Sequence, residues 1–349
     1  MRVLLLAGGA GTRLWPLSTE QRPKQFLSLL SADSLIAQTY ERVRPLTDEI
    51  FVATAARHAP LVRKQLRGLS ARRILTEPCR RNSGPAILSA ALHFESEGDP
   101  VTAAIPSDQT AADPEAFRRA IVTASKAADS ASVVVLAVPP TRPETDFGYL
   151  ELSSEIAGEG TEVVRFIEKP GSAEAESYVQ SGFLWNAGIF VFRPSRLLAE
   201  ARRVAADLLA RVEAYRAALA KGRAKLADEL YASLPAISID YGVMEKAAHV
   251  RAVPLRAGWS DVGTWRAVRD LRGPSDDRGN LIVSEKPVLA PGVRQSAIVC
   301  SDDGVLVLPF DRESELKAAV ERLSNRGPRG PEKAARARAG TRKSGKAKR

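Results

Sequence analysis

MRVLLLAGGAGTRLWPLSTEQRPKQFL, residues 1–27, begins as an apolar run and continues into a glycine-rich loop. Val3–Ala7 has the length and composition of a buried parallel strand. The run ends at three glycines, Gly8, Gly9 and Gly11. Glycine amides can approach an anion closely and direct successive N–H groups toward it. Because Arg13 and Lys24 add two positive charges, the stretch predicts a polyphosphate site at the end of a strand.

Two familiar glycine loops do not match this stretch. The phosphate loop of NTPases requires Gly-Lys followed by Ser or Thr, and no such sequence follows Gly9. The dinucleotide fingerprint GxGxxG places a third glycine where Leu14 stands. The next predicted strand begins at Ile50, which is too distant to supply the acid that binds the ribose.

The stretch instead resembles the signature AGGxGTRLxPLTxxxPKxxL of sugar nucleotidyltransferases. Trp15 and PKQFL, Pro23–Leu27, resemble the mannose-1-phosphate guanylyltransferase branch. The resemblance implies a Rossmann-like α/β fold of the nucleotide-diphospho-sugar transferase type, with a mixed, mainly parallel sheet and a small β-rich carboxyl-terminal appendage. It also implies catalytic roles for Arg13 and Lys24. The implied nucleotide-binding residues of the loop are Leu6, Ala7, Gly8, Gly9, Gly11 and Thr12.

Predicted strands and helices alternate through the first half of the chain, as in a parallel sheet covered on both faces. The predicted strands are 50–53, 73–76, 101–105 and 133–138. The predicted helices are 35–43, 61–69, one that opens within residues 77–87 and runs to about Glu95, and 116–128. Residues 195–230 are rich in alanine and arginine at helical spacing, which predicts a long exposed helix or hairpin without chemical function.

EPCRRNSGPAI, Glu77–Ile87, follows the third predicted strand. Ligands of open α/β sheets bind beyond the carboxyl ends of the strands, so this segment is expected beside the glycine loop. Glu77, Asn82 and the amides at a helix start can pair with a purine edge, whereas Asn82 or Ser83 can equally cap the helix. Similarity to the EPxxRNTAPAI segment of guanylyltransferases implies base contacts from Glu77, Pro78 and Asn82.

A carboxylate, Asp108, follows the fourth predicted strand. Magnesium takes one or two carboxylates together with phosphate and water. The resemblance makes Asp108 the metal aspartate of a PxDH motif and Asp261, in WSDVGTW, a second metal ligand. It therefore implies Mg²⁺, with other divalent cations as alternatives. Gln109 stands where the family has histidine, which puts any supporting role of that histidine in doubt.

Two segments, RFIEKP (165–170) and FLWNAGIFVF (183–192), resemble sugar-binding segments of the family. In TDFGYLEL (145–152), Gly148 allows a sugar to approach the backbone and Tyr149 can shape the pocket. Glu168 can accept hydrogen bonds from sugar hydroxyls, and Lys169 can bind the sugar phosphate during catalysis, although a surface ion pair is the alternative. In SIDYGVMEKA, Asp240 and Glu245 either line the cleft or cap a helix. The predicted substrate-binding residues are Gly148, Tyr149, Glu168, Lys169, Asn186, Gly188 and Asp261.

The predicted domains are a catalytic domain (1–273), a small β-rich domain with a terminal helix (274–324) and a disordered basic tail (325–349). β-type runs separated by turns, among them VLAPGV, define the small domain, which we interpret as an oligomerisation or lid element. The tail holds ten Lys and Arg and one acid, so most of the net charge of +10 lies outside the globular part.

The concentration of positive charge in the tail, with a nearly neutral globular part, predicts neither a specific nucleic-acid partner nor a membrane partner. The tail is interpreted as a solvated extension rather than an arm for RNA or lipid, and its partner is unknown. The two cysteines, Cys79 and Cys300, indicate no disulfide framework. The apolar run at the amino terminus is too short for a signal peptide. A cytoplasmic protein is therefore expected. A homodimer is possible.

The resemblance implies that GTP and mannose 1-phosphate form GDP-mannose and diphosphate, by Mg²⁺-assisted in-line attack on the α-phosphate. It also implies a short form of the enzyme without an isomerase domain. Three alternatives remain open: another nucleoside triphosphate, another sugar 1-phosphate such as a heptose or fucose derivative, and a catalytically silent subunit that senses nucleotide sugars.

Overall fold

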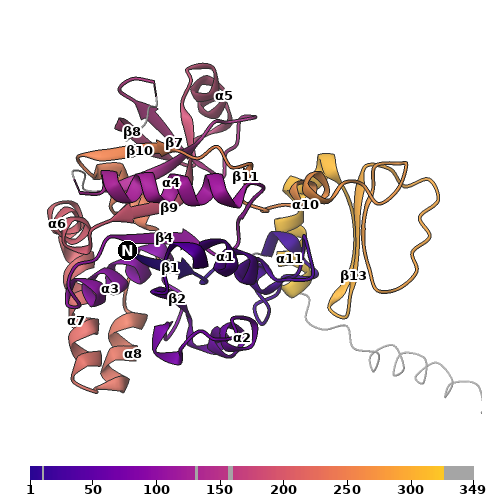
Figure 1. The fold of residues 1–349 in the computed structure, drawn as a ribbon. Coiled ribbons are helices and arrows are strands. Elements are labelled where there is room, and N and C mark those ends of the chain that lie inside the picture. Colours follow the sequence, from indigo (N-terminus) through magenta and orange to yellow (C-terminus); the bar gives the residue numbers. More distant parts are fainter. Residues whose placement is uncertain (10–11, 130–132, 156–159, 326–349) are drawn as a thin grey trace, which may run out of the picture. The chain divides into compact units, whose positions relative to one another are not determined.

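The computed structural model describes residues 1–9, 12–129, 133–155 and 160–325 (Figure 1). Within these residues, nine strands form one sheet in the order β3-β2-β1-β4-β9-β6-β10-β8-β7. Their bounds are β1 Arg2–Leu6, β2 Ile50–Ala55, β3 Ile74–Glu77, β4 Thr102–Pro106, β6 Val133–Val138, β7 Gly148–Leu152, β8 Thr161–Glu168, β9 Leu184–Phe192 and β10 Val250–Pro254. The five strands predicted in the first part of the chain all form, as β1, β2, β3, β4 and β6, with bounds shifted by one or two residues at several ends.

The sheet is parallel at one end and mixed at the other. Strands β3, β2, β1 and β4 run parallel, with Val3 opposite Ile50 on one side and Ala103 on the other. Strand β9 then runs antiparallel to both β4 and β6, and β7 and β8 form an antiparallel pair. The parallel end carries the glycine loop, and the antiparallel end carries the predicted sugar segments.

Side-chain alternation along the strands divides the core of this sheet between its two faces. Val3 and Leu5 lie in one buried cluster, and Leu4 lies in the other. The first cluster packs against α1 (Leu35–Val43), α2 (Ala59–Gln65), α4 (Pro114–Ala127) and α5 (Ser172–Gln180). The second packs against α3 (Ser83–Glu95), α6 (Pro194–Val204), α7 (Ala206–Ala220), α8 (Ala224–Ala232) and α9 (Ile239–Gly242). Helices therefore cover both faces, as the alternating pattern predicts.

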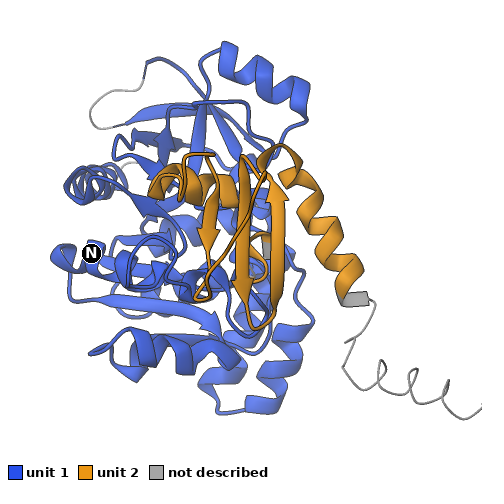
Figure 2. Cartoon of the chain, turned by 90° about the vertical axis from the view of Figure 1, so that its right-hand side faces the viewer, with its two compact units in different colours: residues 1–11, 18–263 blue, residues 12–17, 264–349 orange. Residues whose placement is uncertain are grey.

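The chain divides into two compact units (Figure 2). Unit 1 comprises residues 1–11 and 18–263, and unit 2 comprises residues 12–17 together with the chain from Thr264 onward. This division differs from the predicted boundary after residue 273 in two ways. The helix α10 (Trp265–Arg272) belongs to unit 2, and so does a six-residue part of the glycine-loop signature.

Unit 2 contains, among its described residues, a sheet of three strands: β12 (Leu281–Val283), β13 (Ser296–Ser301) and β14 (Gly304–Pro309). The helical turn η7 (Phe310–Glu315) and the helix α11 (Leu316–Asn325) follow. VLAPGV, expected as a β-type run, forms no strand because Pro291 and Gly292 make a turn. The predicted basic tail lies outside the described residues.

Residues 12–17 are fixed within unit 2 by Trp15 and Pro16. The indole Nε1 of the buried Trp265 donates to the carbonyl oxygen of Trp15 at 3.1 Å. Ser301 Oγ donates to the Pro16 carbonyl at 3.3 Å. The Trp15 ring lies over Gly304, where a Cβ atom would be 2.7 Å from the ring. Trp15 and Pro16, within the glycine-loop signature, are therefore packed into unit 2.

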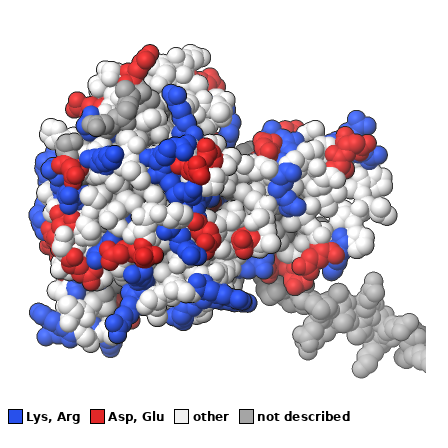
Figure 3. Space-filling model, in the orientation of Figure 1, with Lys and Arg blue, Asp and Glu red and all other residues white. Residues whose placement is uncertain are grey.

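Residues 195–230 form three helices, α6, α7 and α8, rather than one helix or a simple hairpin. No described helix has the length and apolar character needed to cross a membrane. On the face shown in Figure 3, basic and acidic side chains are interspersed over the described residues.

Candidate active site

A cavity of about 220 Å³ lies at the carboxyl ends of the parallel strands of unit 1. Its lining includes most of the residues predicted to bind a nucleotide: Leu6, Ala7, Gly8, Gly9, Glu77, Asn82 and Asp108. Gln25, Arg80, Arg81, Ser83 and Pro106 also line it. The structure therefore brings together the glycine loop, the segment after β3 and the end of β4. Pro78 is not among the residues that line this cavity.

The carbonyl groups of the glycine loop are bound by neighbouring side chains. Thr54 Oγ1 and Gln25 Nε2 donate to the Ala7 carbonyl at 3.0 and 2.9 Å. Arg80 Nη2 donates to the Gly9 carbonyl at 3.0 Å. In a trans peptide the N–H points opposite to the carbonyl, so the Gly8 N–H is directed away from these donors. The loop is held in an orientation that suits an anion.

Lys24 connects the two predicted metal aspartates. It begins the short turn η2 (Lys24–Phe26) and is 6% exposed. Its Nζ lies 3.0 Å from Asp108 Oδ2 and donates to the backbone carbonyl of Asp261 at 2.5 Å. Gly9 is close by, since a Cβ atom there would lie 4.0 Å from Asp108 Oδ2. Residues from three distant parts of the chain thus meet at one ammonium group.

The donor set at this point fits a hard divalent cation. The Asp108 carboxylate and the backbone carbonyl of Asp261 both meet Lys24, and oxygen atoms of these two kinds are the ligands that magnesium prefers. The Asp261 carboxylate lies over Gly263, where a Cβ atom would be 2.2 Å from Oδ2. Gly263 therefore leaves room for that carboxylate, and any larger residue would displace it.

Glu77 is the last residue of β3 and lines the cavity, and its carboxyl group is hydrogen-bonded by a residue of the distant helix α8. The hydroxyl of Tyr231, on α8, donates to Glu77 Oε2 at 2.6 Å. Burial raises the pKa of Glu77 to about 7, against the opposing effect of the Tyr231 hydrogen bond. The carboxyl can therefore change its charge near neutral pH.

Asn82 both lines the cavity and caps α3. Its Oδ1 accepts from the Ser83 N–H at 2.8 Å, and its backbone has φ 66° and ψ −171°, a conformation that residues with a side chain rarely adopt. The start of α3 is further fixed by Gly84, whose N–H donates to the Ile237 carbonyl at 3.0 Å. A Cβ atom at Gly84 would be 2.7 Å from that oxygen, so only glycine allows this approach.

The predicted sugar residues meet where β7 lies between β8 and β9. Gly148 is directly opposite Glu168 on one side and Asn186 on the other. A Cβ atom at Gly148 would be 2.7 Å from Glu168 Oε2 and 3.3 Å from Asn186 Cβ. Asn186 Nδ2 donates to Asp240 Oδ1 at 3.0 Å, and its Oδ1 accepts from the Gly188 N–H at 2.9 Å. Asp240 therefore lies in this cluster rather than only capping a helix.

The charges of this cluster are strongly coupled. Burial raises the pKa of Asp240 to about 7, and the charge of Glu168 acts in the same direction. Burial likewise raises the pKa of Glu168, against its ion pair with Lys169. Burial lowers the pKa of Lys169, but the hydrogen bond and charge of Glu168 outweigh it and the net shift is upward. Two acids and one cation thus share a partly buried site.

Lys169 has a φ of 51°, which is uncommon for a residue with a side chain. Its backbone N–H donates to the Phe147 carbonyl at 3.1 Å, which holds this conformation. Such backbone strain persists where the surroundings fix it and is concentrated at functional sites. The conformation is consistent with a specific role for Lys169.

Tyr149 does not belong to this cluster. It follows Gly148 on β7 and therefore points to the other face of the sheet, where it is fully buried in the core. Its ring packs against Tyr178, and its hydroxyl accepts from the Glu144 N–H at 2.9 Å. The predicted contact between Tyr149 and a sugar is corrected accordingly.

Gln109, which replaces the family histidine, connects β9 to β11 (Trp259–Ser260), which pairs with β5 (Thr110–Ala111). Its Nε2 donates to the Ala187 carbonyl at 2.7 Å, and its Oε1 accepts from Trp259 Nε1 at 2.9 Å. The next residue of β9, Gly188, has a φ of 69° and its Cβ position is 3.9 Å from Gln109 Nε2. Gln109 therefore supports the backbone between Asn186 and the predicted metal aspartates.

Three predicted loop residues are described separately from this site. Gly11 lies outside the described residues. Thr12 and Arg13 form the start of η1 (Thr12–Leu14) in unit 2, where Arg13 is exposed. Their nucleotide-binding and catalytic roles remain predictions.

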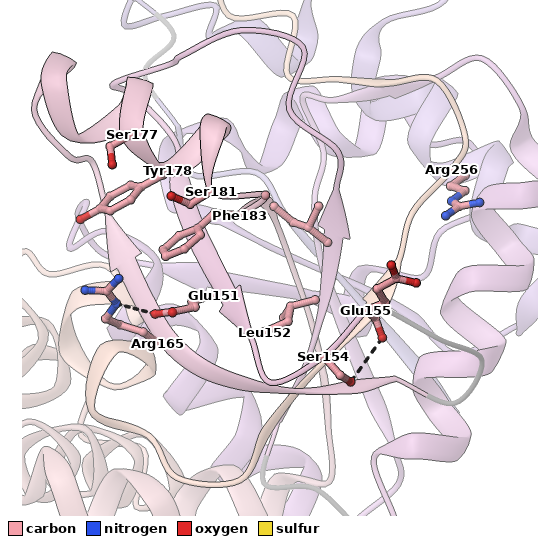
Figure 4. Close-up of a pocket in the computed structure, with 12 residues that line it drawn as sticks. Glu151, Leu152, Ser154, Glu155, Arg165, Ser177, Tyr178, Ser181, Phe183 and Arg256 are labelled. Atoms are coloured by element: carbon pink, nitrogen blue, oxygen red, sulfur yellow. Dashed lines mark hydrogen bonds and ion pairs between the residues drawn. The ribbon is translucent and has the colours of Figure 1, made fainter.

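A larger cavity, of about 770 Å³, lies elsewhere in unit 1 (Figure 4). Its wall combines the stacked rings of Tyr178 and Phe183 with Arg165, which pairs with Glu151 at 2.9 Å. None of the predicted site residues is among its described lining residues. Size alone would therefore have selected the wrong cavity for the glycine-loop chemistry.

Sequence reasoning did not identify the roles of Gln25, Arg80, Arg81 and Tyr231. Arg80 and Arg81 were within a quoted motif and could have been selected as cations beside a phosphate site. Tyr231 carries no local signal, because its partner Glu77 lies far away in the sequence.

Comparison with known proteins places these features in context. A family model described as "Nucleotidyl transferase" matches residues 2–273. The chain is 37% identical to Xanthan biosynthesis protein XanB of Xanthomonas campestris pv. campestris (strain B100), over 93% of this chain and 73% of that protein. It is 36% identical to a mannose-1-phosphate guanylyltransferase of Klebsiella pneumoniae, over 92% of this chain and 73% of that protein. A crystal structure from Thermus thermophilus, described as a mannose-1-phosphate geranyltransferase, matches with a TM-score of 0.83 and 36% identity, over 93% of this chain and 99% of that one.

Proposed function

This chain belongs to the nucleotidyl transferase family, and from that membership we propose that it is a mannose-1-phosphate guanylyltransferase. It would transfer the guanylyl group of GTP to mannose 1-phosphate and release pyrophosphate. The observation that carries the proposal is the meeting of Lys24, Asp108 and Asp261 beside the glycine loop. That meeting joins the glycine loop, a cation, the Asp108 carboxylate and the backbone carbonyl of Asp261 in one place.

The cavity beside the loop supports guanine as the base. An ionised Glu77 offers only acceptors, and guanine presents two donors, N1–H and N2–H₂, on one edge. Charge-assisted hydrogen bonds of this kind are among the stronger ones in proteins. The side-chain NH₂ group of Asn82, whose Oδ1 caps α3, suits the O6 acceptor of the same base.

The cluster at β7, β8 and β9 supports a sugar 1-phosphate as the second substrate. Glu168, Asn186 and Asp240 offer several acceptors and one amide donor for hydroxyl groups. Lys169, which pairs with Glu168, is the cation of this cluster for the phosphate group. Gly148 keeps the wall between Glu168 and Asn186 free of a side chain, so a sugar ring can lie against the backbone.

The proposed reaction is an in-line displacement at the α-phosphorus of GTP. An oxygen of the sugar phosphate forms the new P–O bond, and the bond to the β-phosphate oxygen breaks so that pyrophosphate leaves. No proton transfer is required, because the attacking and leaving groups are both anionic. The chain therefore acts by positioning and by neutralising charge, with Lys24 and Lys169 as the main cations and Arg13 as a further one.

Asp108 and Asp261 would hold a divalent cation, with Mg²⁺ as the first choice. When bound, that ion would supply positive charge to neutralise the phosphates. Lys24 links Asp108 to the backbone of Asp261 and would keep the two aspartates in register. The contribution of each such charge to transition-state stabilisation is about 3 kcal/mol.

The test is pyrophosphate release by the purified protein with Mg²⁺, over four nucleoside triphosphates and a set of sugar 1-phosphates. Release with GTP and mannose 1-phosphate above the other combinations is expected. Release with a heptose or fucose 1-phosphate instead would keep the mechanism and change the substrate. A folded protein that binds GDP-mannose but releases no pyrophosphate in any combination would contradict catalysis and favour a sensing subunit.

A further inference from the structure

Tyr231 connects the helical pair α7–α8 to the nucleotide cavity of unit 1. Its side chain is fully buried, and its hydroxyl lies 2.6 Å from Glu77 Oε2. Glu77 lines the cavity together with the glycine loop. One hydroxyl group from a region without recognisable motifs therefore reaches a carboxyl that faces the nucleotide.

Tyr231 is the donor in this hydrogen bond. Burial raises the pKa of Tyr231 far above its ordinary value, and the nearby charge of Glu77 raises it further. The phenol consequently keeps its proton at every pH at which the protein works. Its partner must accept, so the pair favours the ionised form of Glu77 over the protonated form.

Glu77 is balanced between its two forms by opposing effects. Burial raises the pKa of Glu77 to about 7, and the hydrogen bond from Tyr231 opposes that rise. Several titratable or charged groups surround the pair on the cavity wall or in the packed helices: Cys79, Arg80, Arg81, Asp108 and Tyr215. Tyr231 is the group among them that donates directly to the Glu77 carboxyl.

The protonation state of the Glu77 carboxyl group decides which purine base it can pair with. A carboxylate accepts two hydrogen bonds, which matches N1–H and N2–H₂ of guanine. A protonated carboxyl has one donor and one acceptor, which matches the N1 acceptor and N6–H₂ donor of adenine. A mismatched buried donor or acceptor is left unsatisfied, and that penalty is the basis of discrimination.

We propose that Tyr231 is a specificity-determining positioning residue, whose hydroxyl holds Glu77 as the acceptor-only carboxylate that selects GTP over ATP. The inference rests on the proposed function, because it assigns a determinant of base choice to the same pocket. It places that determinant on α8, outside the signature motifs.

The first experiment compares Tyr231→Phe with the wild-type protein and with Tyr215→Phe as the matched control. Tyr215 packs edge-on against Tyr231, with ring centroids 4.7 Å apart, so its variant tests general disturbance of the same helices. The kcat/KM for GTP and for ATP, each with mannose 1-phosphate, is measured from about pH 6 to about pH 9, a range that spans the midpoint of Glu77.

Tyr231→Phe is expected to lower kcat/KM for GTP by about 10- to 100-fold, mainly through KM, as befits a hydrogen bond to a charged group. The loss with ATP is expected to be smaller, so the GTP/ATP ratio falls, and the pH at which GTP use declines moves upward. Tyr215→Phe should leave the ratio and the pH profile unchanged. Equal losses with both nucleotides and an unmoved pH profile would show a merely structural role and overturn the inference.

Glu77→Gln provides a second variant that does not depend on the folding of the tyrosine variant. The amide has one donor and one acceptor at every pH, so the GTP/ATP ratio should fall and lose its pH dependence. An unchanged ratio in Glu77→Gln would remove Glu77, and with it Tyr231, from base selection.

The titration of Glu77 separates this inference from the proposed function. Carboxyl ¹³C NMR of nucleotide-free protein, with the Glu77 signal assigned by its loss in Glu77→Gln, should show a higher midpoint in Tyr231→Phe than in the wild type. An unmoved midpoint would refute the role of Tyr231 whatever the substrate proves to be. Absence of GDP-mannose formation by the wild type would instead refute the proposed function.

Discussion

The ammonium group of Lys24 lies 3.0 Å from the carboxylate of Asp108 in the interior of unit 1. Lys24→Ala would remove the cation and leave Asp108 without its partner, at the point where phosphate charge is expected. Turnover should fall by about 100- to 1,000-fold, the usual effect of losing one such electrostatic contact. Pyrophosphate release measures it, and circular dichroism checks the fold. The exposed Lys64→Ala serves as the control, and comparable turnover in the two variants would remove Lys24 from the mechanism.

Removal of divalent metal tests the two aspartates together. EDTA should abolish turnover, and added Mg²⁺ should restore it, because Asp108 and Asp261 offer the oxygen ligands that this ion needs. Asp261→Asn should lower turnover by about 100-fold or more and raise the Mg²⁺ concentration required for half activity. An Asp261→Asn enzyme with wild-type turnover and metal demand would exclude that residue as a ligand.

Asp240 should make the stability of the protein depend on pH. Burial raises its pKa to about 7 in the folded state, whereas an unfolded aspartate titrates near about 3.9. Between those values the folded protein binds more protons than the unfolded chain, so this group lowers the free energy of unfolding as pH rises through the window. Asp240→Asn keeps an oxygen for Asn186 and removes the charge. It should therefore be more stable than wild type at about pH 8, by on the order of 1–3 kcal/mol, and lose sugar binding.

Urea denaturation near about pH 5 and about pH 8 measures this effect, because the charge on Asp240 differs between the two conditions. The exposed Asp48→Asn is the control, with no pH-dependent gain expected. If Asp240→Asn shifts stability equally at both pH values, charge burial at this position is not the cause.

Gln109 should tolerate histidine but not alanine. Its amide donates to the Ala187 carbonyl and accepts from Trp259 Nε1, and a neutral imidazole also has one donor and one acceptor. Gln109→Ala leaves the Ala187 carbonyl and the Nε1 of the half-buried Trp259 without this partner, and should cost about 2–4 kcal/mol of stability together with about tenfold in kcat/KM. Gln109→His should approach wild type near about pH 8 and lose activity near about pH 6, where a protonated imidazole has no acceptor.

Thermal unfolding and kcat/KM at both pH values check the Gln109 series. Full activity and stability in Gln109→Ala would show that the hydrogen bonds of Gln109 to β9 and β11 contribute to neither activity nor stability.

The local sequence pattern predicted the helices and strands that position the site. Glycines, acids at strand ends and apolar runs can each be recognised within a few residues of sequence. Gly148 is an instructive case: the sequence marked it as a point of close approach, and the structure adds that Glu168 and Asn186 flank it on two neighbouring strands. The strand β9 was predicted as a segment, whereas its antiparallel place between β4 and β6 depends on pairing between distant residues.

What the sequence did not predict involves partners that are remote along the chain. Tyr149 was predicted to bind substrate because it follows Gly148 in a segment expected to contact a sugar. Side chains alternate between the faces of a paired strand, and this alternation places the Tyr149 side chain in the core. The Tyr231–Glu77 hydrogen bond joins two elements whose packing no local pattern specifies. The assignment of residues 12–17 to unit 2 likewise required Trp265 and Gly304 to be seen against Trp15.

The assignment of residues 12–17 to unit 2 limits where this chain can be divided into separate fragments. Six residues encoded near the amino terminus complete the core of a unit whose other members follow Thr264. A gene fusion, truncation or chimera cut at residue 263 would separate Trp15 from its buried indole partner, Trp265. A cut at residue 273 would keep Trp265 but remove Ser301 and Gly304, which contact the same segment. The two units are thus not interchangeable modules, and exchange of the carboxyl-terminal part between relatives should succeed only when the Trp15 segment is exchanged with it.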